Sequence, residues 1–418
     1  MLQVISSSWA LLLGMMLLMV GNGLQGTLLG VRGDIEGFST FEMSIVMSAY
    51  FLGFLGGSRL TPGLIRRVGH VRVFAAMASF ISAVLVLYAT WANPWFWVVM
   101  RVIVGFCFSG VYVTAESWLN NAATNDTRGK ALSLYMIVQM VGIVAAQGLL
   151  LTADPSGFML FIIPSVLVSI SFAPILLSIS PTPAFESSRP MSLKELYMLS
   201  PLGCVGMFLL GGIFSAQFGM SAVYGAEVGL SLGQISLFVS AFYIGATLMQ
   251  YPLGWFSDRM DRRVLIFAVS ALGAAGALLA MFGGGSFQVL LAAAFIIGGT
   301  SNPLYSLLIA YTNDFIDLDD MAAVSGGLVF INGLGAISGP VITGWSMGIF
   351  GPPGYFLFIG MMLAISAVYA AWRMTQRAAP AVDETSGYTP VTMSTSAVAV
   401  ELAIEEGAED TEQGSESN

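Results

Sequence analysis

The sequence has very few charged residues. Only 9% of its 418 residues are Asp, Glu, Lys or Arg, whereas 56% are hydrophobic. A water-soluble domain of this length needs far more charge on its surface. Two cysteines, Cys107 and Cys204, and one histidine, His70, suit neither a disulfide framework nor a zinc cluster. We therefore predict a protein that is not an enzyme and that holds no metal or cofactor.

The charges that are present divide into two groups. Before residue 378 the basic and acidic residues balance, while the stretch from Asp383 to Glu416 is acidic and has no Lys or Arg. The sequence has no basic patch for nucleic acid. The composition of residues 378–418 buries too little apolar surface to fold alone, so we predict a disordered acidic tail. Such a tail is also a candidate contact for a protein partner.

Long apolar runs recur along the chain. Each is about 20 residues long, the length that crosses ~30 Å of hydrocarbon as a helix. The sequence thus predicts an all-α polytopic membrane protein in a lipid bilayer. Twelve transmembrane helices are expected, at 9–31, 42–65, 72–91, 95–119, 130–151, 157–179, 201–225, 233–256, 263–283, 287–311, 323–348 and 354–373.

The longest interruption divides these spans into two sets of six. We predict an N-terminal six-helix bundle at 1–180, a cytoplasmic linker at 181–200, a C-terminal six-helix bundle at 201–377 and the tail at 378–418. Most Lys and Arg residues fall on one side of this arrangement. That side is expected to be cytoplasmic, with both termini on it.

A faint internal repeat relates the two halves. With a shift of 193 residues, Gly105 falls on Gly298, Tyr50 on Tyr243 and Gly142 on Gly335. Two like halves suggest a site between them near the middle of the membrane.

Two motifs resemble those of the major facilitator superfamily. Gly254-Trp255-Phe256-Ser257-Asp258-Arg259-Met260-Asp261-Arg262-Arg263 resembles its cytoplasmic signature Gly-x-x-x-Asp-Arg-x-Gly-Arg-Arg, with Asp261 in place of the second Gly. Arg101-Val102-Ile103-Val104-Gly105 looks like its fourth-span Arg-x-x-x-Gly motif. The segment 115–120 is similar to a branch of bacterial members. The resemblance implies two rocking bundles that expose a cavity to each side of the cell inner membrane in turn.

Polar residues within the spans are the candidates for the cavity. Arg101 is the sharpest, because a charge inside a span costs roughly 2.5–3.5 kcal/mol unless it faces a cavity or partner. The alternative for Arg101 is that it snorkels or braces neighbouring helices. The predicted cavity set is Asn22, Gln25, Tyr50, Arg101, Gln139, Gln217, Tyr243, Asn302 and Tyr305. For Gln147 and Asn332 we favour bonding between helices.

Charges at the cytoplasmic ends predict a gate. Glu116 is expected to pair with Arg66 or Arg67, and Asp258 with Arg262 or Arg128. The gate set is Arg66, Arg67, Glu116, Arg128, Asp258, Arg259 and Arg262; solvated charges that only set topology are the alternative.

The sequence thus favours a secondary active or facilitative transporter. No Asp or Glu lies deep in a predicted span, and Arg101 favours a neutral or anionic small molecule as substrate. The coupling ion, proton or sodium, is left open. Alternatives are efflux of amphipathic drug-like compounds and a non-transporting sensor or scaffold that signals through the tail.

Overall fold

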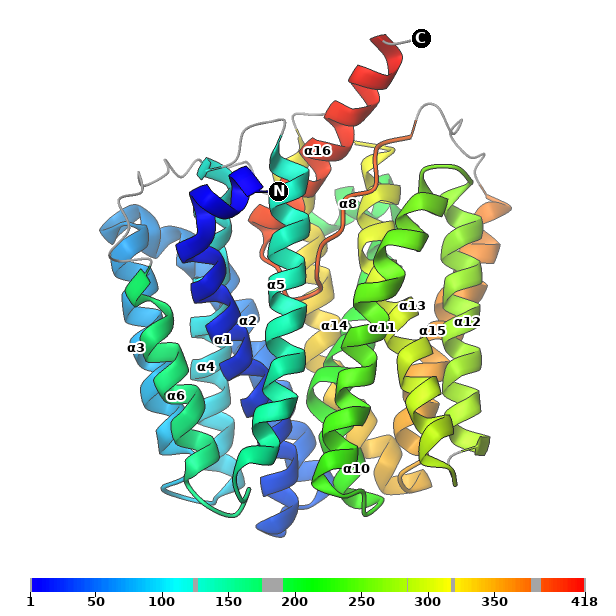
Figure 1. Cartoon of the computed structure of the whole chain (residues 1–418). Coiled ribbons are helices and arrows are strands. Elements are labelled where there is room, and N and C mark those ends of the chain that lie inside the picture. The colour runs from blue at the N-terminus through cyan, green and yellow to red at the C-terminus, as the bar shows by residue number, and fades with distance from the viewer. Residues whose placement is uncertain are drawn as a thin grey trace.

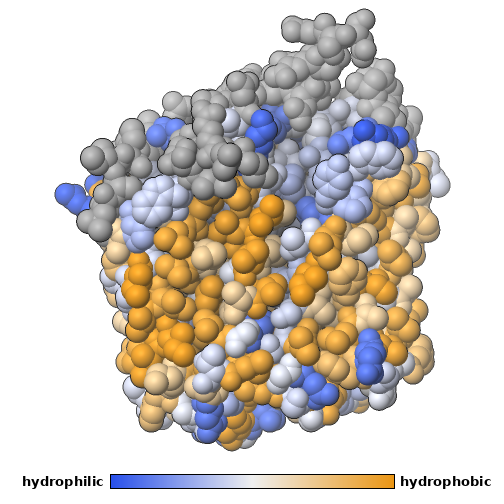
Figure 2. Space-filling model, viewed as in Figure 1, coloured by the Kyte–Doolittle hydropathy of each residue, from blue (hydrophilic) through white to orange (hydrophobic). Residues whose placement is uncertain are grey.

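The structure is a computed structural model, and it describes residues 2–122, 127–174, 191–283, 285–316, 320–376 and 385–416. All regular elements in these ranges are helices, arranged as a bundle with α1 starting and α16 ending on the same side (Figure 1). We call this the tail side of the molecule, and the other the opposite side. A broad band of hydrophobic side chains surrounds the middle of the visible face, as a lipid-facing surface requires (Figure 2).

Eleven helical stretches of the described residues are long and apolar enough to cross a membrane. The first half contains α1 (Leu2–Ile35), α2 (Thr40–Val68), α3 (His70–Leu87), α4 (Pro94–Ala122), α5 (Arg128–Leu149), η2 (Leu150–Thr152) and the shorter α6 (Met159–Ser171). The predicted sixth span, 157–179, is thus represented by α6, and its last residues lie outside the described ranges. Part of the predicted linker is also outside them, and its end forms α8 (Leu193–Leu199).

The second half repeats the first. Its seventh span is built from α9 (Pro201–Ser215), the π-helical turn η3 (Ala216–Met220) and α10 (Ser221–Glu227). The remaining spans are α11 (Leu232–Ser257), α12 (Arg262–Gly283), α13 (Phe287–Asn313), α14 (Met321–Phe350) and α15 (Gly354–Met374).

The same local signals shape corresponding corners of the two halves. Gly37 and Gly229 have φ of 76° and 74°, a conformation that suits glycine, and each ends a span. Ser39 and Ser231 then cap α2 and α11, with Glu42 or Gln234 completing a capping box.

Helix packing follows the repeat as well. Helix α1 packs on α5 and α6 as α9 packs on α14 and α15, and α2 packs on α4 as α11 packs on α13. At the crossings, Gly105 lies against the Tyr50 carbonyl and Gly298 against the Phe242 carbonyl, with no room for a methyl group. The glycines that align in the sequence are therefore the points where backbones meet.

The two bundles touch directly near the opposite side. Gly30 lies against Ala222, Gly344 against Ser44, and the Thr40 hydroxyl donates to Glu227 at 3.2 Å. Helices α2 and α14 and helices α5 and α11 form the long seams. This end of the path between the bundles is closed.

The tail differs from the prediction of disorder. Residues 385–396 run between the bundles without regular structure and turn at Met393–Ser394, and α16 (Ala397–Glu416) rises from them to the tail side (Figure 1). Val391, Met393, Val400 and Ile404 are buried. Composition alone misses this because the apolar surface that the tail lacks is supplied by the two bundles.

Candidate solute site between the bundles

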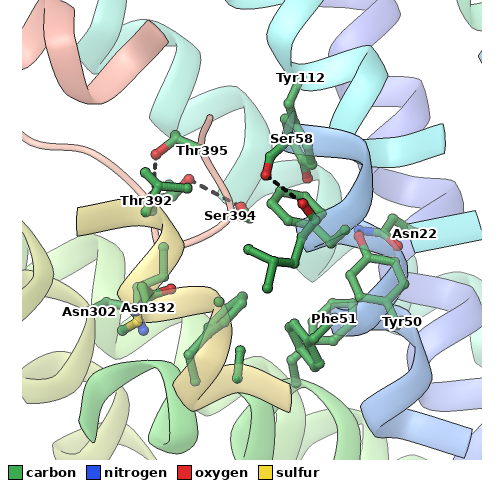
Figure 3. A pocket seen from close by; sticks show the side chains of 18 of the residues that line it. Asn22, Tyr50, Phe51, Ser58, Tyr112, Asn302, Asn332, Thr392, Ser394 and Thr395 are labelled. Atoms are coloured by element: carbon green, nitrogen blue, oxygen red, sulfur yellow. Dashed lines mark hydrogen bonds between the residues drawn. The ribbon is translucent and has the colours of Figure 1, made fainter. Parts of the chain in front are cut away.

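A small cavity of about 30 Å³ lies between the two bundles. Its lining is rich in aromatic side chains, and Figure 3 shows polar side chains on both sides of the cavity. Among the residues that the structure describes, no Asp, Glu, Lys or Arg lines it. The aromatic lining residues are Tyr50, Phe51, Phe54, Tyr112, Phe214, Phe218 and Tyr243, and the amide residues are Asn22, Asn302 and Asn332.

The predicted cavity residues Asn22, Tyr50, Tyr243 and Asn302 all line this space. Asn22 donates weakly to the Tyr50 hydroxyl at 3.5 Å, and its Oδ1 has no hydrogen-bond partner among the described residues. The amide of Asn302 reaches only its own helix, at Gly298 O, 3.5 Å away. Both amides therefore retain capacity to bond a solute or water.

Arg101 and Gln25 lie behind the cavity wall. Arg101 is fully buried, donates to Gln25 Oε1 at 3.3 Å, and holds its guanidinium 4.9 Å from the centre of the Tyr50 ring. Among the described residues it forms no ion pair. In this conformation Tyr50 separates it from the cavity, so the expected contact with the cavity is not made here. It faces the protein interior rather than lipid.

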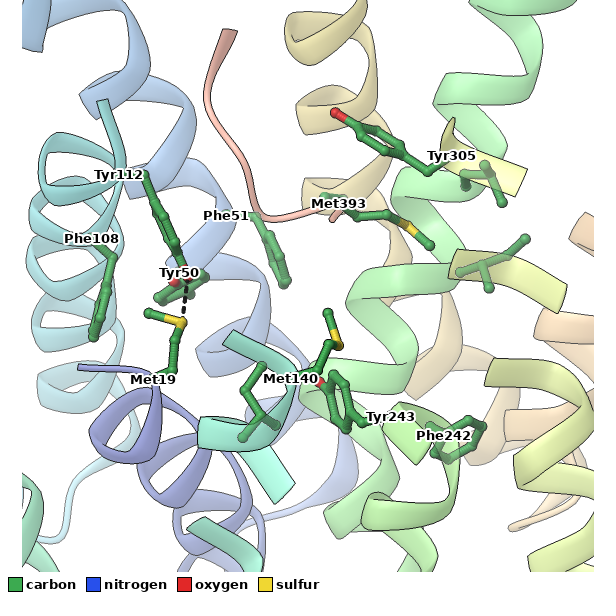
Figure 4. Close-up of a cluster of buried hydrophobic side chains, with 14 of the residues drawn as sticks. Met19, Tyr50, Phe51, Phe108, Tyr112, Met140, Phe242, Tyr243, Tyr305 and Met393 are labelled. Atoms are coloured by element: carbon green, nitrogen blue, oxygen red, sulfur yellow. Dashed lines mark hydrogen bonds between the residues drawn. The ribbon is translucent and has the colours of Figure 1, made fainter. Parts of the chain in front are cut away.

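Three other predicted residues lie around the cavity rather than on its main lining. Gln217, inside the π-helical turn, donates to Ser301 at 2.9 Å. Gln139 accepts from Ser394 of the tail at 3.5 Å. Tyr305 is buried, and Figure 4 draws it in the same apolar cluster as Met393. Asn332 bonds Met207 O at 3.0 Å, as favoured from the sequence, and also lines the cavity.

Sequence reasoning missed the phenylalanines of the lining and the tail residues Thr392 to Thr395. Phe51 and Phe54 follow Tyr50 on α2, but apolar residues in a span look alike whether they face lipid or a cavity. The tail residues carry no such signal at all.

Some of the predicted gate charges have partners other than those we predicted. Glu116 accepts from Ser396 and Tyr135, so it does not pair with Arg66 or Arg67 in this conformation, where those two arginines are exposed; the pair stays a prediction for the state closed on the tail side. Asp258 does lie 3.8 Å from Arg262. Arg259 stacks on Trp255, 4.3 Å from the ring centre.

Arg262 is the best-connected of these charges. It forms an ion pair with Asp314 and donates to the Ser386 carbonyl, while its side chain is 2% exposed. Burial raises the pKa of Asp314, although Arg262 and the Ser386 N–H oppose the shift. Asp261, which stands where the motif has its second glycine, pairs with Arg263 at 2.8 Å. Burial and the charge of Glu405 raise the pKa of Glu401 to about 7.

A family model described as Major Facilitator Superfamily matches residues 11–224 and again 202–395. The chain belongs to the major facilitator superfamily. Its members are transporters rather than enzymes, and this one is a multi-pass membrane protein.

Two relatives share the name "Uncharacterized MFS-type transporter YcaD". That of Escherichia fergusonii is 26% identical over 367 residues, with 86% of this chain and 93% of the relative covered. That of Salmonella arizonae is 25% identical over the same coverage.

Solved structures of the superfamily share the fold. The nucleoside transporter NupG aligns with a TM-score of 0.71 at 15% identity, covering 88% of this chain and 98% of that one. A bacterial homolog of the human lysosomal transporter Spinster gives 0.68 at 13% identity, covering 98% of both chains. The fucose:proton symporter FucP of E. coli gives 0.58 at 15% identity, covering 89% and 99%.

Proposed function

We propose that this superfamily member carries a small uncharged solute across the bacterial inner membrane by alternating access. The observation that carries the proposal is the cavity between the bundles, which is ringed by aromatic side chains and amides and has no charged side chain in its lining among the described parts of the chain. The bundles meet on the opposite side, so the cavity belongs to a state that opens towards the tail side.

The lining favours a solute that has neutral polar groups and a ring face, either a planar base or the C–H face of a sugar. Rings of Tyr50, Phe218 and Tyr243 offer faces and edges for stacking. The Asn22 carbonyl and the Asn302 amide offer an acceptor and a donor. Nucleosides and sugars fit this chemistry, and the named substrates of NupG and FucP belong to these classes.

The alternative of an anionic solute depends on Arg101. Its charge is buried without a carboxylate partner and is one ring away from the cavity. Movement of Tyr50 in the outward-open state would bring an anion within reach of it. The neutral lining of the present cavity favours the uncharged solute, because an unpaired anion against these rings is costly to desolvate.

A binding screen with matched pairs tests the proposal. Purified protein in detergent is heated with nucleosides and hexoses, and separately with the anionic partner of each, a nucleoside 5′-monophosphate or a hexuronate. Bound ligand raises Tm by mass action, because a hundredfold excess over Kd adds about 2.7 kcal/mol to the free energy of unfolding. We expect shifts only with the neutral members. Shifts confined to the anions would refute the neutral-solute proposal.

Two variants locate the site. Asn302→Ala should remove the shift, because it deletes an amide of the lining, whereas Asn121→Ala at the exposed end of α4 should leave it unchanged. An equal response of both variants would place binding elsewhere. Uptake of the same solute into proteoliposomes then separates a transporter from a sensor, which binds without transport.

The side of the tail is proposed to be cytoplasmic. This follows from the positive-inside rule, since Arg66, Arg67 and Arg259 lie at the tail-side ends of their helices. The coupling ion, proton or sodium, stays open. A pH or sodium gradient imposed on the proteoliposomes decides between coupled and facilitative transport.

A further inference from the structure

The cavity already holds a ligand, which is part of the chain itself. Thr392, Met393, Ser394 and Thr395 lie on the cavity lining, far along the chain from the helices that form the rest of it. Figures 3 and 4 show this segment descending between the two bundles, with Met393 beside the apolar cluster. We call residues 385–407 the plug.

Backbone groups of the plug are bonded specifically. Val391 exchanges two hydrogen bonds with the Ser306 hydroxyl of α13, its N–H donating at 3.0 Å and its carbonyl accepting at 3.2 Å. The N–H of Tyr388 donates to Asp258 at 3.0 Å. Asn313 donates to the Ile404 carbonyl at 3.1 Å. The buried backbone groups named here have hydrogen-bond partners on the bundles, so the plug is docked at a defined position.

The tightest contact joins the start of α16 to the first bundle. Ser396 caps the helix by accepting from Val398 N–H at 3.2 Å. Its own N–H and hydroxyl both donate to the carboxylate of Glu116, which is fully buried. A carboxylate at a helix N-terminus is also stabilised by the helix dipole.

Two arginines of the bundles hold the two ends of the plug. Arg128 pairs with Glu405 at 3.1 Å, and Arg262 binds the Ser386 carbonyl. The ends of the plug are also tied together, since Gly387 N–H donates to the Gly407 carbonyl at 2.8 Å. Four residues that the sequence marked as gate charges, Glu116, Arg128, Asp258 and Arg262, are thus contacts of the plug.

We infer that the plug is an autoinhibitory ligand of the solute cavity. It occupies the space in which the solute would bind and bridges both bundles at the tail side, so the path on this side opens only when the plug leaves. This inference rests on the proposed transport function for its inhibitory meaning. The docking of the plug, in contrast, is measurable without any substrate.

The experiment uses the reactivity of a cysteine in the cavity wall. Ser58 lines the cavity, so a Ser58→Cys variant is made in a background in which the buried Cys107 and Cys204 are replaced by Ala. The probe is a water-soluble maleimide added to protein in nanodiscs. We expect slow labelling with the plug present, and at least roughly tenfold faster labelling when residues 378–418 are deleted.

Three comparisons secure the result. Deleting only residues 409–418 removes none of the contacts above and should keep labelling slow. Met393→Glu in the full chain puts an unpaired charge into the cavity and should speed labelling, even if the long deletion fails to fold. A synthetic peptide of residues 385–407 should slow labelling again when added to the long deletion.

Equal labelling rates in the full chain, the long deletion and Met393→Glu would overturn the inference. So would an unchanged rate on adding the peptide to a folded long deletion. Neither result depends on whether a solute is transported. Faster uptake by the long deletion, measured with a solute from the screen, would then be the expected sign of inhibition.

Discussion

Replacing Ser396 by Ala should release the plug, because one hydroxyl serves two interactions. It donates to the buried Glu116 carboxylate and accepts from Val398 N–H as the cap of α16. A hydrogen bond to a charged group contributes about 1.5–3 kcal/mol, and a helix cap about 0.5–2 kcal/mol. Their loss leaves the Ser396 N–H as the remaining donor of this residue to Glu116.

The expected weakening of docking is therefore about 2–5 kcal/mol, which is roughly 30-fold to 4,000-fold in the docking equilibrium. Hydrogen–deuterium exchange of the Val391 and Ser396 amides measures it directly, since both amides are bonded only when the plug is seated. The matched control is Ser394→Ala, two residues away, whose hydroxyl makes a hydrogen bond within the tail, with the Thr392 hydroxyl at 3.2 Å, and a long 3.5 Å contact with Gln139. That variant should change exchange by less than about threefold.

Two further variants separate the two roles of the hydroxyl. Ser396→Thr keeps the donor and the cap and should restore protection. Ser396→Asp keeps a good cap but sets a second carboxylate against Glu116, so protection should fall further than in Ser396→Ala. Equal exchange in the Ala variants at 394 and 396 would refute the argument that the Glu116 contact anchors the plug.

Other predictions concern the plug, the repeat and the buried arginine. The contribution of Glu401 to plug docking should be fully present below about pH 4.5 and be lost as the pH rises through about 7, because burial gives docked Glu401 a pKa of about 7 against an ordinary 4.5; the ratio of the Ser58→Cys labelling rates with Glu401 and with Glu401→Gln, taken at each pH, should change across this range, and a constant ratio would contradict it. Gly105→Val and Gly298→Val should abolish folded protein on size-exclusion chromatography, whereas Gly63→Ala, which meets nothing nearby, should not; well-folded Gly105→Val would disprove the close crossing. Arg101→Gln should leave the free energy of unfolding within about 1 kcal/mol of the parent, because no carboxylate among the described residues loses a partner, and should abolish transport only if the solute is an anion; a large fall in Tm would show that Arg101 braces the bundle.

The membrane class, the superfamily and its twofold repeat could be predicted from the sequence by itself. Low charge, apolar runs of fixed length and glycines at a constant offset are local or periodic signals, and lipid leaves the backbone few structures to choose from. The choice of Asn22, Tyr50, Tyr243 and Asn302 as lining residues rested on the same logic, because polar side chains in a span rarely face lipid.

Only the tertiary structure decided where the remaining side chains and the tail lie. The position of Arg101 behind Tyr50, rather than at the cavity surface, depends on how two helices are rotated against each other. The partner of Glu116 is a serine 280 residues further along the chain, and no sequence period connects them. The tail folds because two bundles supply the buried surface and hydrogen-bond partners that its own composition lacks, and such a long-range contact leaves no trace in local sequence.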